Sequence, residues 1–142
     1  MRGTVLLNRT GRPEIVYGKP CPPEVLAHEV WVTEAELLLG RPIKRGVRVG
    51  KAIADGLMIR DGEGYWIEVD NETMSTRQLR EKWRKYGKVQ GFILVICHSK
   101  ARLRKLMKSA ERVKAVTLFT RFRWLKARHL TQRWIDWWGH RV

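Results

Sequence analysis

The sequence AIADGLMIRDGEGYWIEVD, at residues 52–70, contains two β-prone runs joined by a turn, and it indicates which fold to expect. An Asp-Gly pair between alternating apolar residues is one of the strongest short-range signals of a β-hairpin. We therefore expect AIADGLMIR (52–60) and YWIEVDNE (65–72) to form adjacent antiparallel strands. Successive side chains of a strand point to opposite faces, so Glu68 and Asp70 share one face of the second strand.

The length of the turn determines whether a third carboxylate joins these two. A two-residue loop, formed by Asp61 and Gly62, is one possibility, and a four-residue loop is the other even-numbered one. The shorter loop places Asp55 opposite Glu68, and the longer loop places it opposite Asp70. In both cases three carboxylates converge on one face. An odd-numbered loop with a bulge would separate them.

The other expected elements surround this hairpin. A helix begins at Glu24, with a short strand at VWVT (30–33) as the alternative for its middle. Residues 41–51 are polar and contain glycine, which indicates a loop or an irregular strand start. The remaining predictions, in chain order, are a β-hairpin at 3–17, a helix at 73–89, a buried strand at 91–97, a helix at 99–113, a strand at 115–122 and a C-terminal helix within 129–142.

This order of elements predicts the α/β class, a sandwich with a mixed central sheet flanked by helices. We expect the main domain at 21–125, preceded by an N-terminal β-hairpin extension at 1–20. A Trp-rich C-terminal helix at 126–142 would pack on the domain or at a homodimer interface, through Trp134, Trp137 and Trp138. Base stacking or anchoring at a membrane surface is the alternative use of these tryptophans.

One lysine of the helix at 73–89 departs from the pattern of a solvated helix face. Asn71 or Thr73 is expected to cap this helix. Its apolar positions follow helical spacing: Leu79, Trp83 and Tyr86. Lys82 lies within this apolar stripe, so it should face the sheet and reach toward a counter-charge. The carboxylate face of the hairpin is the expected partner.

The charge of the chain is unevenly distributed. The net charge is +15, and residues 77–142 contain 19 Lys and Arg against three acids, whereas residues 1–76 contain 10 bases and 11 acids. A strongly basic half combined with an acidic patch suits a protein that binds a polyanion by its phosphates and offers carboxylates to metal ions. Nucleic acid is therefore the expected partner. We expect phosphate contacts from Arg77, Arg80, Arg84, Lys85, Lys88, Lys100, Arg102, Arg104 and Lys105.

Cysteine usage and hydropathy exclude several classes of protein. Cys21 and Cys97 lie far apart in the sequence, which favours reduced thiols over a disulfide framework or a zinc site. No apolar run approaches the roughly 20 residues of a membrane span. These features predict a soluble cytoplasmic protein that is not bound to a membrane. His28 is expected to be a helix or core histidine, because no second histidine lies at metal-ligand spacing.

Four stretches resemble the nuclease-like domain of the plasmid replication-relaxation family, and through it the PD-(D/E)XK nuclease core. These stretches are WVTEAEL (31–37), ADGL (54–57), IEVDNETMSTRQLREKWRKY (67–86) and ILVICHSKARLRKL (93–106). The resemblance covers residues 24–120 and implies a restriction-endonuclease-like sandwich. It also implies that the hairpin at 3–17 is the remnant of the wing of a winged-helix domain. The matching positions of the family pattern are Asp55, Glu68, Asp70, Thr73, Lys82 and Tyr86.

The resemblance implies a role for each candidate site residue. Asp55 and Glu68 would hold Mg²⁺ or Mn²⁺, hard cations that require oxygen ligands. Asp70 would be a third metal ligand or would orient a water, and Lys82 would stabilise charge or position the nucleophile. Glu34 would complete the acidic cluster. The chain departs from the pattern in Ala54, where proline is expected, and in Asp70, which stands where active nucleases have lysine.

The function expected from these features is that of a metal-dependent DNA endonuclease, acting in mobile-element, plasmid or phage DNA metabolism. The alternative is a non-catalytic DNA-binding accessory protein for replication or mobilisation on the same fold. A third reading is a basic RNA-binding protein, which would favour RNA over DNA in competition at fixed salt.

Overall fold

The fold is described from a computed structural model of the chain, which describes residues 2–7, 13–18, 23–87, 91–111, 116–127, 133–136 and 140. Its helices are α1 (Pro23–Leu39), α2 (Thr76–Tyr86), α3 (Lys100–Ser109) and α4 (Phe122–Lys126). Its strands are β1 (Arg2–Leu7), β2 (Pro13–Gly18), β3 (Lys44–Val49), β4 (Ala52–Arg60), β5 (Glu63–Val69), β6 (Phe92–Cys97), β7 (Val116–Arg121) and β8 (Ile135–Asp136). None of the helices in these ranges is long and apolar enough to cross a membrane.

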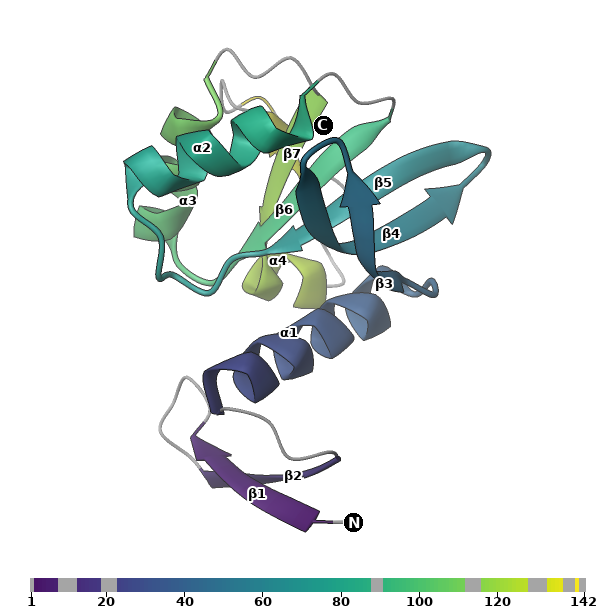
Figure 1. Ribbon diagram of the computed structural model, residues 1–142, viewed down its shortest axis with the longest axis vertical. Coiled ribbons are helices and arrows are strands. Elements are labelled where there is room, and N and C mark those ends of the chain that lie inside the picture. Colours follow the sequence, from purple (N-terminus) through teal and green to yellow (C-terminus); the bar gives the residue numbers. More distant parts are fainter. Residues whose placement is uncertain are drawn as a thin grey trace.

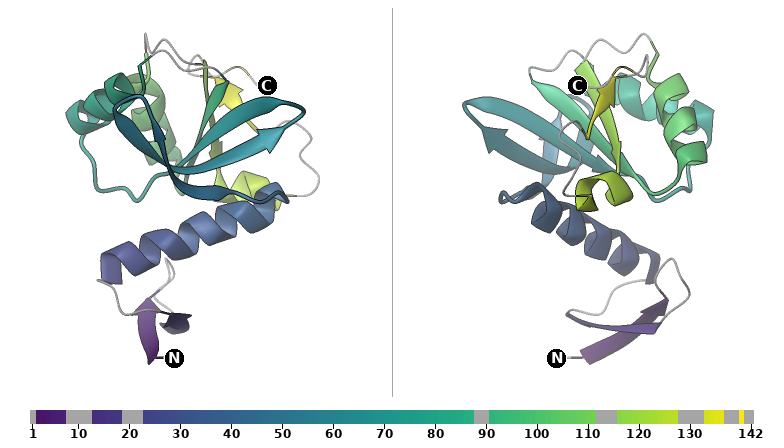
Figure 2. Two further views of the ribbon diagram at one scale, coloured as in Figure 1. Left: turned by 45° about the vertical axis from the view of Figure 1, so that its right-hand side comes forward. Right: turned by 180° about the vertical axis from the view of Figure 1, so that it is seen from behind.

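A six-stranded mixed sheet forms the centre of the fold, with strand order β3-β4-β5-β6-β7-β8. The strands β3, β4 and β5 form an antiparallel meander, β6 and β7 run parallel to β5, and β8 pairs antiparallel to β7. Helices α2 and α3 cover one face of the sheet and α1 and α4 the other (Figures 1 and 2). The predicted α/β class, with a mixed sheet flanked by helices, is confirmed.

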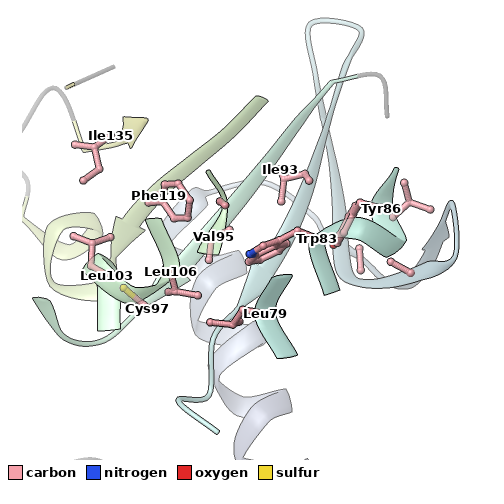
Figure 3. Packing of buried hydrophobic residues seen from close by; sticks show 14 residues of the cluster. Leu79, Trp83, Tyr86, Ile93, Val95, Cys97, Leu103, Leu106, Phe119 and Ile135 are labelled. Carbon is pink, nitrogen blue, oxygen red and sulfur yellow. The ribbon is translucent and has the colours of Figure 1, made fainter. Parts of the chain in front are cut away.

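Strand β6 lies in the middle of the sheet because its side chains are apolar on both faces. Ile93, Val95 and Cys97 belong to the cluster packed under α2 and α3, which Figure 3 shows around Trp83 and Phe119. Leu94 and Ile96 belong to the second cluster, on the side of α1. A strand covered on both faces is typical of parallel pairing, because the crossover helices lie against the sheet. The prediction of a buried strand from the continuous apolar run FILVIC is therefore confirmed.

The turn between β4 and β5 is the two-residue loop that the sequence offered. Arg60 pairs with Glu63, and Asp61 and Gly62 between them have φ angles of 52° and 79°. Positive φ at both loop positions is the requirement of the type I′ turn that suits the twist of a hairpin. The even-numbered loop is therefore confirmed, and the register of the ladder, which ends at Gly56 and Ile67, leaves Asp55 and Glu68 as the next opposite residues.

Strand β4 changes its packing partners at Asp55. Ala52 and Ala54 belong to the cluster under α2, whereas Met58, on the same side of the strand by parity, belongs to the cluster on the side of α1. The strand therefore twists sharply between these positions. Gly56 lies within the twist, where a Cβ would come 1.9 Å from Cγ2 of the buried Ile43.

The turn between β3 and β4 packs against the C-terminus of α2. The backbone N–H of Lys51 donates to the carbonyl of Lys85 at 2.8 Å, which satisfies one of the carbonyls that a helix end leaves open. Gly50, with φ of +58°, lies so close to the helix that a Cβ would be 2.7 Å from the carbonyl oxygen of Tyr86. The β3–β4 hairpin thereby holds the last turn of α2 against the sheet.

Helix α2 begins at Thr76, three residues after Thr73, and its N-cap is not one of the residues predicted. Ser75 forms a capping box with Gln78: the serine Oγ accepts from the Gln78 N–H at 3.2 Å, and the Gln78 side chain accepts from the Ser75 N–H at 2.8 Å. The prediction of Asn71 or Thr73 as the cap was wrong. A Ser-x-x-Gln capping box satisfies two backbone N–H groups, which a single capping side chain does not.

Two further predictions need correction, and two are confirmed. Residues 44–49, expected to be a loop or an irregular strand start, form the regular edge strand β3. The predicted C-terminal helix is wrong where it is described, since Ile135 and Asp136 pair with Phe119 and Leu118 of β7. Sheet-edge pairing outweighed the helical spacing of the tryptophans, of which Trp137 and Trp138 lie outside the described residues. The two confirmed predictions concern the N-terminal part of the chain. Helix α1 continues through VWVT (30–33), and β1 and β2, which precede α1 in the chain, form the expected hairpin (Figure 1).

We expect the Gly56→Ala variant to be less stable than the wild type by about 1–3 kcal/mol, because the new methyl group overlaps the Ile43 side chain inside a packed cluster. Urea unfolding followed by circular dichroism measures the difference. Gly64→Ala is the matched control, since its Cβ would meet Leu57 at an ordinary 3.7 Å. Equal loss of stability in both variants would contradict the proposed close contact.

Candidate functional site

The site lies where β4 leaves β5. Beyond the last ladder pair, the Asp55 carboxylate takes the place of a backbone partner: its Oδ2 accepts from the Val69 N–H at 2.8 Å. Its Oδ1 lies 2.8 Å from Nε2 of His28 on α1. Asp55 is thus held between two strands and a helix, with a fifth of its side chain exposed.

Glu68 is the most deeply buried acid of the described residues, with 2% of its surface exposed. Two residues of α2 contact its carboxylate: Lys82 places Nζ 2.6 Å from Oε2, and the Tyr86 hydroxyl donates to Oε1. Residues four apart lie on one face of a helix, so this pair reaches the carboxylate together. The prediction that Lys82 faces the sheet and pairs with the carboxylate face is confirmed.

Glu68, Lys82 and Tyr86 all have shifted pKa values. Burial raises the pKa of Glu68 to about 7, against the opposing effect of the Lys82 ammonium and with a further rise from Asp55. The pKa of Lys82 is raised although burial acts to lower it, because Glu68 and Asp55 favour its charged form. Burial and the neighbouring Glu68 raise the pKa of Tyr86, so this hydroxyl remains a donor.

His28 is a site residue that the sequence reasoning placed only as a helix or core histidine. Its hydrogen bond to Asp55 raises the pKa of the imidazole, although burial opposes this. Burial alone would raise the pKa of Asp55, but His28 and the Val69 N–H hold it below its ordinary value. No spacing in the sequence links residues 28 and 55. They meet because α1 packs against the sheet where the β4–β5 ladder ends.

Asp70 does not join Asp55 and Glu68. Its two oxygens accept from Nε and Nη2 of Arg102 at 2.6 and 2.8 Å, and Arg102 also donates to the Met74 carbonyl at 2.8 Å. Both side chains are less than a tenth exposed. The expected convergence of three carboxylates is therefore corrected, and within the described ranges no three His, Cys, Asp or Glu side chains gather as a metal-binding group.

Two other candidates lie away from the group. Glu34, expected to complete the acidic cluster, forms an ion pair with Lys126 of α4, with Oε1 and Nζ 3.4 Å apart. The residue of α1 that contacts the group is His28, through its hydrogen bond to Asp55. Thr73 is exposed, and its hydroxyl donates to the side chain of Asn71.

The predicted phosphate-binding residues divide into exposed and buried ones. Arg102 is buried, and Asp70 and the Met74 carbonyl accept three of its N–H donors. Its assignment to phosphate contact is therefore corrected, because its charge is paired with Asp70 inside the fold and is not exposed to a ligand. Lys88 lies outside the described residues. The exposed members, on α2 and α3 over one face of the sheet, are Arg77, Arg80, Arg84, Lys85, Lys100, Arg104 and Lys105. We refer to these seven residues as the basic surface.

Asp55 and Glu68 fit a hard divalent cation, and Asp70 does not. The buried Oε2 of Glu68 has the Lys82 ammonium 2.6 Å away and no further partner among the residues described. Each carboxylate oxygen has two lone pairs, so both acids retain acceptor capacity beyond their present bonds.

Comparison of the chain with family models, with curated proteins and with solved structures gives no match.

We expect Glu68 to make the stability of the protein depend on pH. Its pKa is about 7 in the fold against an ordinary 4.5, so the folded state binds the proton more tightly. Its contribution is fully present below pH 4.5 and is lost as the pH rises through about 7. Relative to Glu68→Gln, the wild type should lose on the order of 3 kcal/mol of unfolding free energy over this range. Urea unfolding at pH 4.5, 6 and 8 measures it.

The control for this measurement is Glu81→Gln, which changes an exposed glutamate of α2. Its pH dependence should follow that of the wild type. Parallel stability curves for the wild type and Glu68→Gln would show that the Glu68 proton is not linked to folding.

We expect Arg102→Met to cost about 3–5 kcal/mol, because it leaves the buried Asp70 carboxylate without its counter-charge. Arg104→Met, two residues along α3 at an exposed position, should change stability by less than about 0.5 kcal/mol. Thermal and urea unfolding compare the two variants. A small effect of Arg102→Met would mean that the pair contributes little to folding and that Asp70 is free for another partner.

Proposed function

We propose that the protein is a metal-dependent DNA endonuclease of the PD-(D/E)XK type, with a restriction-endonuclease-like core, serving mobile-element, plasmid or phage DNA. The observation that carries the proposal is the grouping of Asp55, Glu68 and Lys82. Asp55 and Glu68 are the next opposite residues beyond the β4–β5 ladder, and the Lys82 ammonium lies 2.6 Å from Oε2 of Glu68. Lys82 from α2 would thus supply the lysine that the family pattern otherwise has at the position of Asp70.

Each residue of the group has a role in phosphodiester hydrolysis. Asp55 and Glu68 would hold Mg²⁺ or Mn²⁺, a metal that when bound lowers the pKa of a coordinated water and offsets charge on the phosphate. Lys82 would stabilise negative charge on the phosphate oxygens. His28 and Tyr86 are positioning residues, since they bind the carboxylates of Asp55 and Glu68 through hydrogen bonds.

The basic surface supports DNA as the substrate. Its seven exposed side chains lie on α2 and α3, and Lys82, on α2, connects this layer to the buried carboxylates. Contacts of this kind with phosphates supply affinity without reading sequence. The net charge of +15 favours a polyanion over a small neutral substrate.

A second candidate is a non-catalytic DNA-binding accessory protein on the same fold. The observation that favours it is the closed Asp70–Arg102 pair, which puts a buried structural ion pair where active nucleases have a lysine. In this case Lys82 and Tyr86 would serve only to compensate the buried charge of Glu68.

We expect the wild type to nick or cut DNA in Mg²⁺ or Mn²⁺ and not in EDTA, and Glu68→Gln or Asp55→Asn to reduce cleavage by roughly 10²-fold or more while retaining DNA affinity. The assay uses supercoiled plasmid, linear duplex and branched DNA, with affinity measured separately by fluorescence anisotropy. Glu81→Gln, at an exposed position of α2, is the matched control and should cut as the wild type does.

The two candidates separate on this assay. If every DNA is bound and none is cut in either metal, the accessory function replaces the endonuclease. If Glu68→Gln cuts as well as the wild type, the carboxylates are not the active site. If no DNA is bound, both candidates are wrong.

A further inference from the structure

A second site lies on the other side of the sheet from the basic surface. A pocket opens there, on the α1 side, between the end of α1, the central strands and the segment before β8. Met58 and Leu94 are its buried apolar floor, and none of its lining residues is acidic. The residues that line it are Leu39, Arg41, Met58, Arg60, Tyr65, Leu94, Leu118 and Trp134.

The side chains that line the pocket suit a planar ligand that carries a negative charge. Tyr65 and Trp134 contribute half-buried aromatic surface, and Tyr65 is itself stacked on Phe92 at a centroid distance of 5.2 Å. Arg41 and Arg60 are exposed, so they lie at its rim. The ion pair of Arg60 with Asp61 is long, at 3.7 Å, and exposed, so it competes weakly with a phosphate.

We propose that this pocket binds an unpaired base of a nucleic-acid strand, with Arg41 and Arg60 on the adjoining phosphates. Aromatic side chains stack on any base, and arginines at the rim bind the backbone that carries it. A base paired within a duplex is stacked on both sides, so only a bulged, gapped or extruded nucleotide can enter. The net charge of +15 favours a polymer over a free nucleotide, which has the same base and phosphate chemistry.

The inference rests on the nucleic-acid binding of the proposed function and extends it to a substrate class. Strands β4 and β5 supply both places: Met58 lies three residues from Asp55, and Tyr65 three residues from Glu68. At about 3.3 Å per residue the two places are roughly 10 Å apart along each strand. DNA with an unpaired nucleotide near a duplex is therefore the preferred substrate, and the unpaired base positions the strand relative to the carboxylates.

The test measures binding in EDTA, where cleavage plays no part. The probes are a fluorescent duplex, the same duplex with a one-nucleotide bulge, and the bulged duplex with 2-aminopurine as the extra base. We expect the wild type to bind the bulged duplex at least roughly fivefold more tightly, the effect of stacking one base on an aromatic side chain. The 2-aminopurine fluorescence should fall on binding. Arg41→Gln/Arg60→Gln and, separately, Tyr65→Leu should reduce the preference to about one.

Arg77→Gln/Arg80→Gln is the matched control, since it removes two arginines from the basic surface and none from the pocket. It should weaken binding of both duplexes equally and leave the preference for the bulge unchanged. The double arginine variant of the rim changes only exposed side chains, so it tests the pocket even if Tyr65→Leu fails to fold.

Any of four outcomes would overturn the inference. The wild type could bind both duplexes equally, the pocket variants could keep the wild-type preference, or free dAMP at equal concentration could displace the bulged duplex, which would make the pocket a site for mononucleotides. The first two leave the proposed function standing, since cleavage is measured separately. Absence of binding to any DNA would overturn the inference and the proposed function together.

Discussion

The burial of the Glu68 carboxylate constrains the structure around it. A charged group that is 2% exposed is costly unless a counter-charge and hydrogen-bond donors reach it. Lys82 and Tyr86 meet this need from one face of α2, and this sets the rotation of the helix on the sheet. Leu79 and Trp83 then lie against the apolar cluster. The β3–β4 turn, packed on the last turn of the helix, holds Tyr86 in place.

Asp55, Glu68 and Asp70 are each paired with a different helix. Asp55 contacts His28 on α1, Glu68 contacts Lys82 on α2, and Asp70 contacts Arg102 on α3. This division explains how three acids close in the fold remain compatible with burial. It also joins the helical layers on both faces of the sheet to the hairpin. Asp70 has a structural role, because Arg102 donates hydrogen bonds to both of its carboxylate oxygens. Asp55 and Glu68 can still accept bonds from a further partner.

The two faces of the sheet have different surfaces toward a nucleic acid. On the α2 and α3 side, the basic surface is suited to phosphates, and Lys82 connects it to the carboxylates. On the α1 side, the pocket combines apolar, aromatic and basic side chains and is suited to a base. Strands β4 and β5 carry both the carboxylates of Asp55 and Glu68 and part of the pocket lining, so a ligand bound in the pocket is aligned with the carboxylates by rigid strands. Sites on strands are positioned more precisely than sites on loops.

Local patterns determined the hairpin, its two-residue turn, the buried strand β6 and the inward direction of Lys82, because alternation, Asp-Gly chemistry and helical spacing act within a few residues. They also brought Asp55 opposite Glu68. The partners of the acids depended on tertiary structure: His28 is 27 residues from Asp55, and Arg102 is 32 residues from Asp70. No local period joins such pairs. The packing of the helices chose His28 over Glu34 and turned Arg102 from a surface cation into a buried counter-charge, and pairing at the sheet edge chose strand over helix at Ile135.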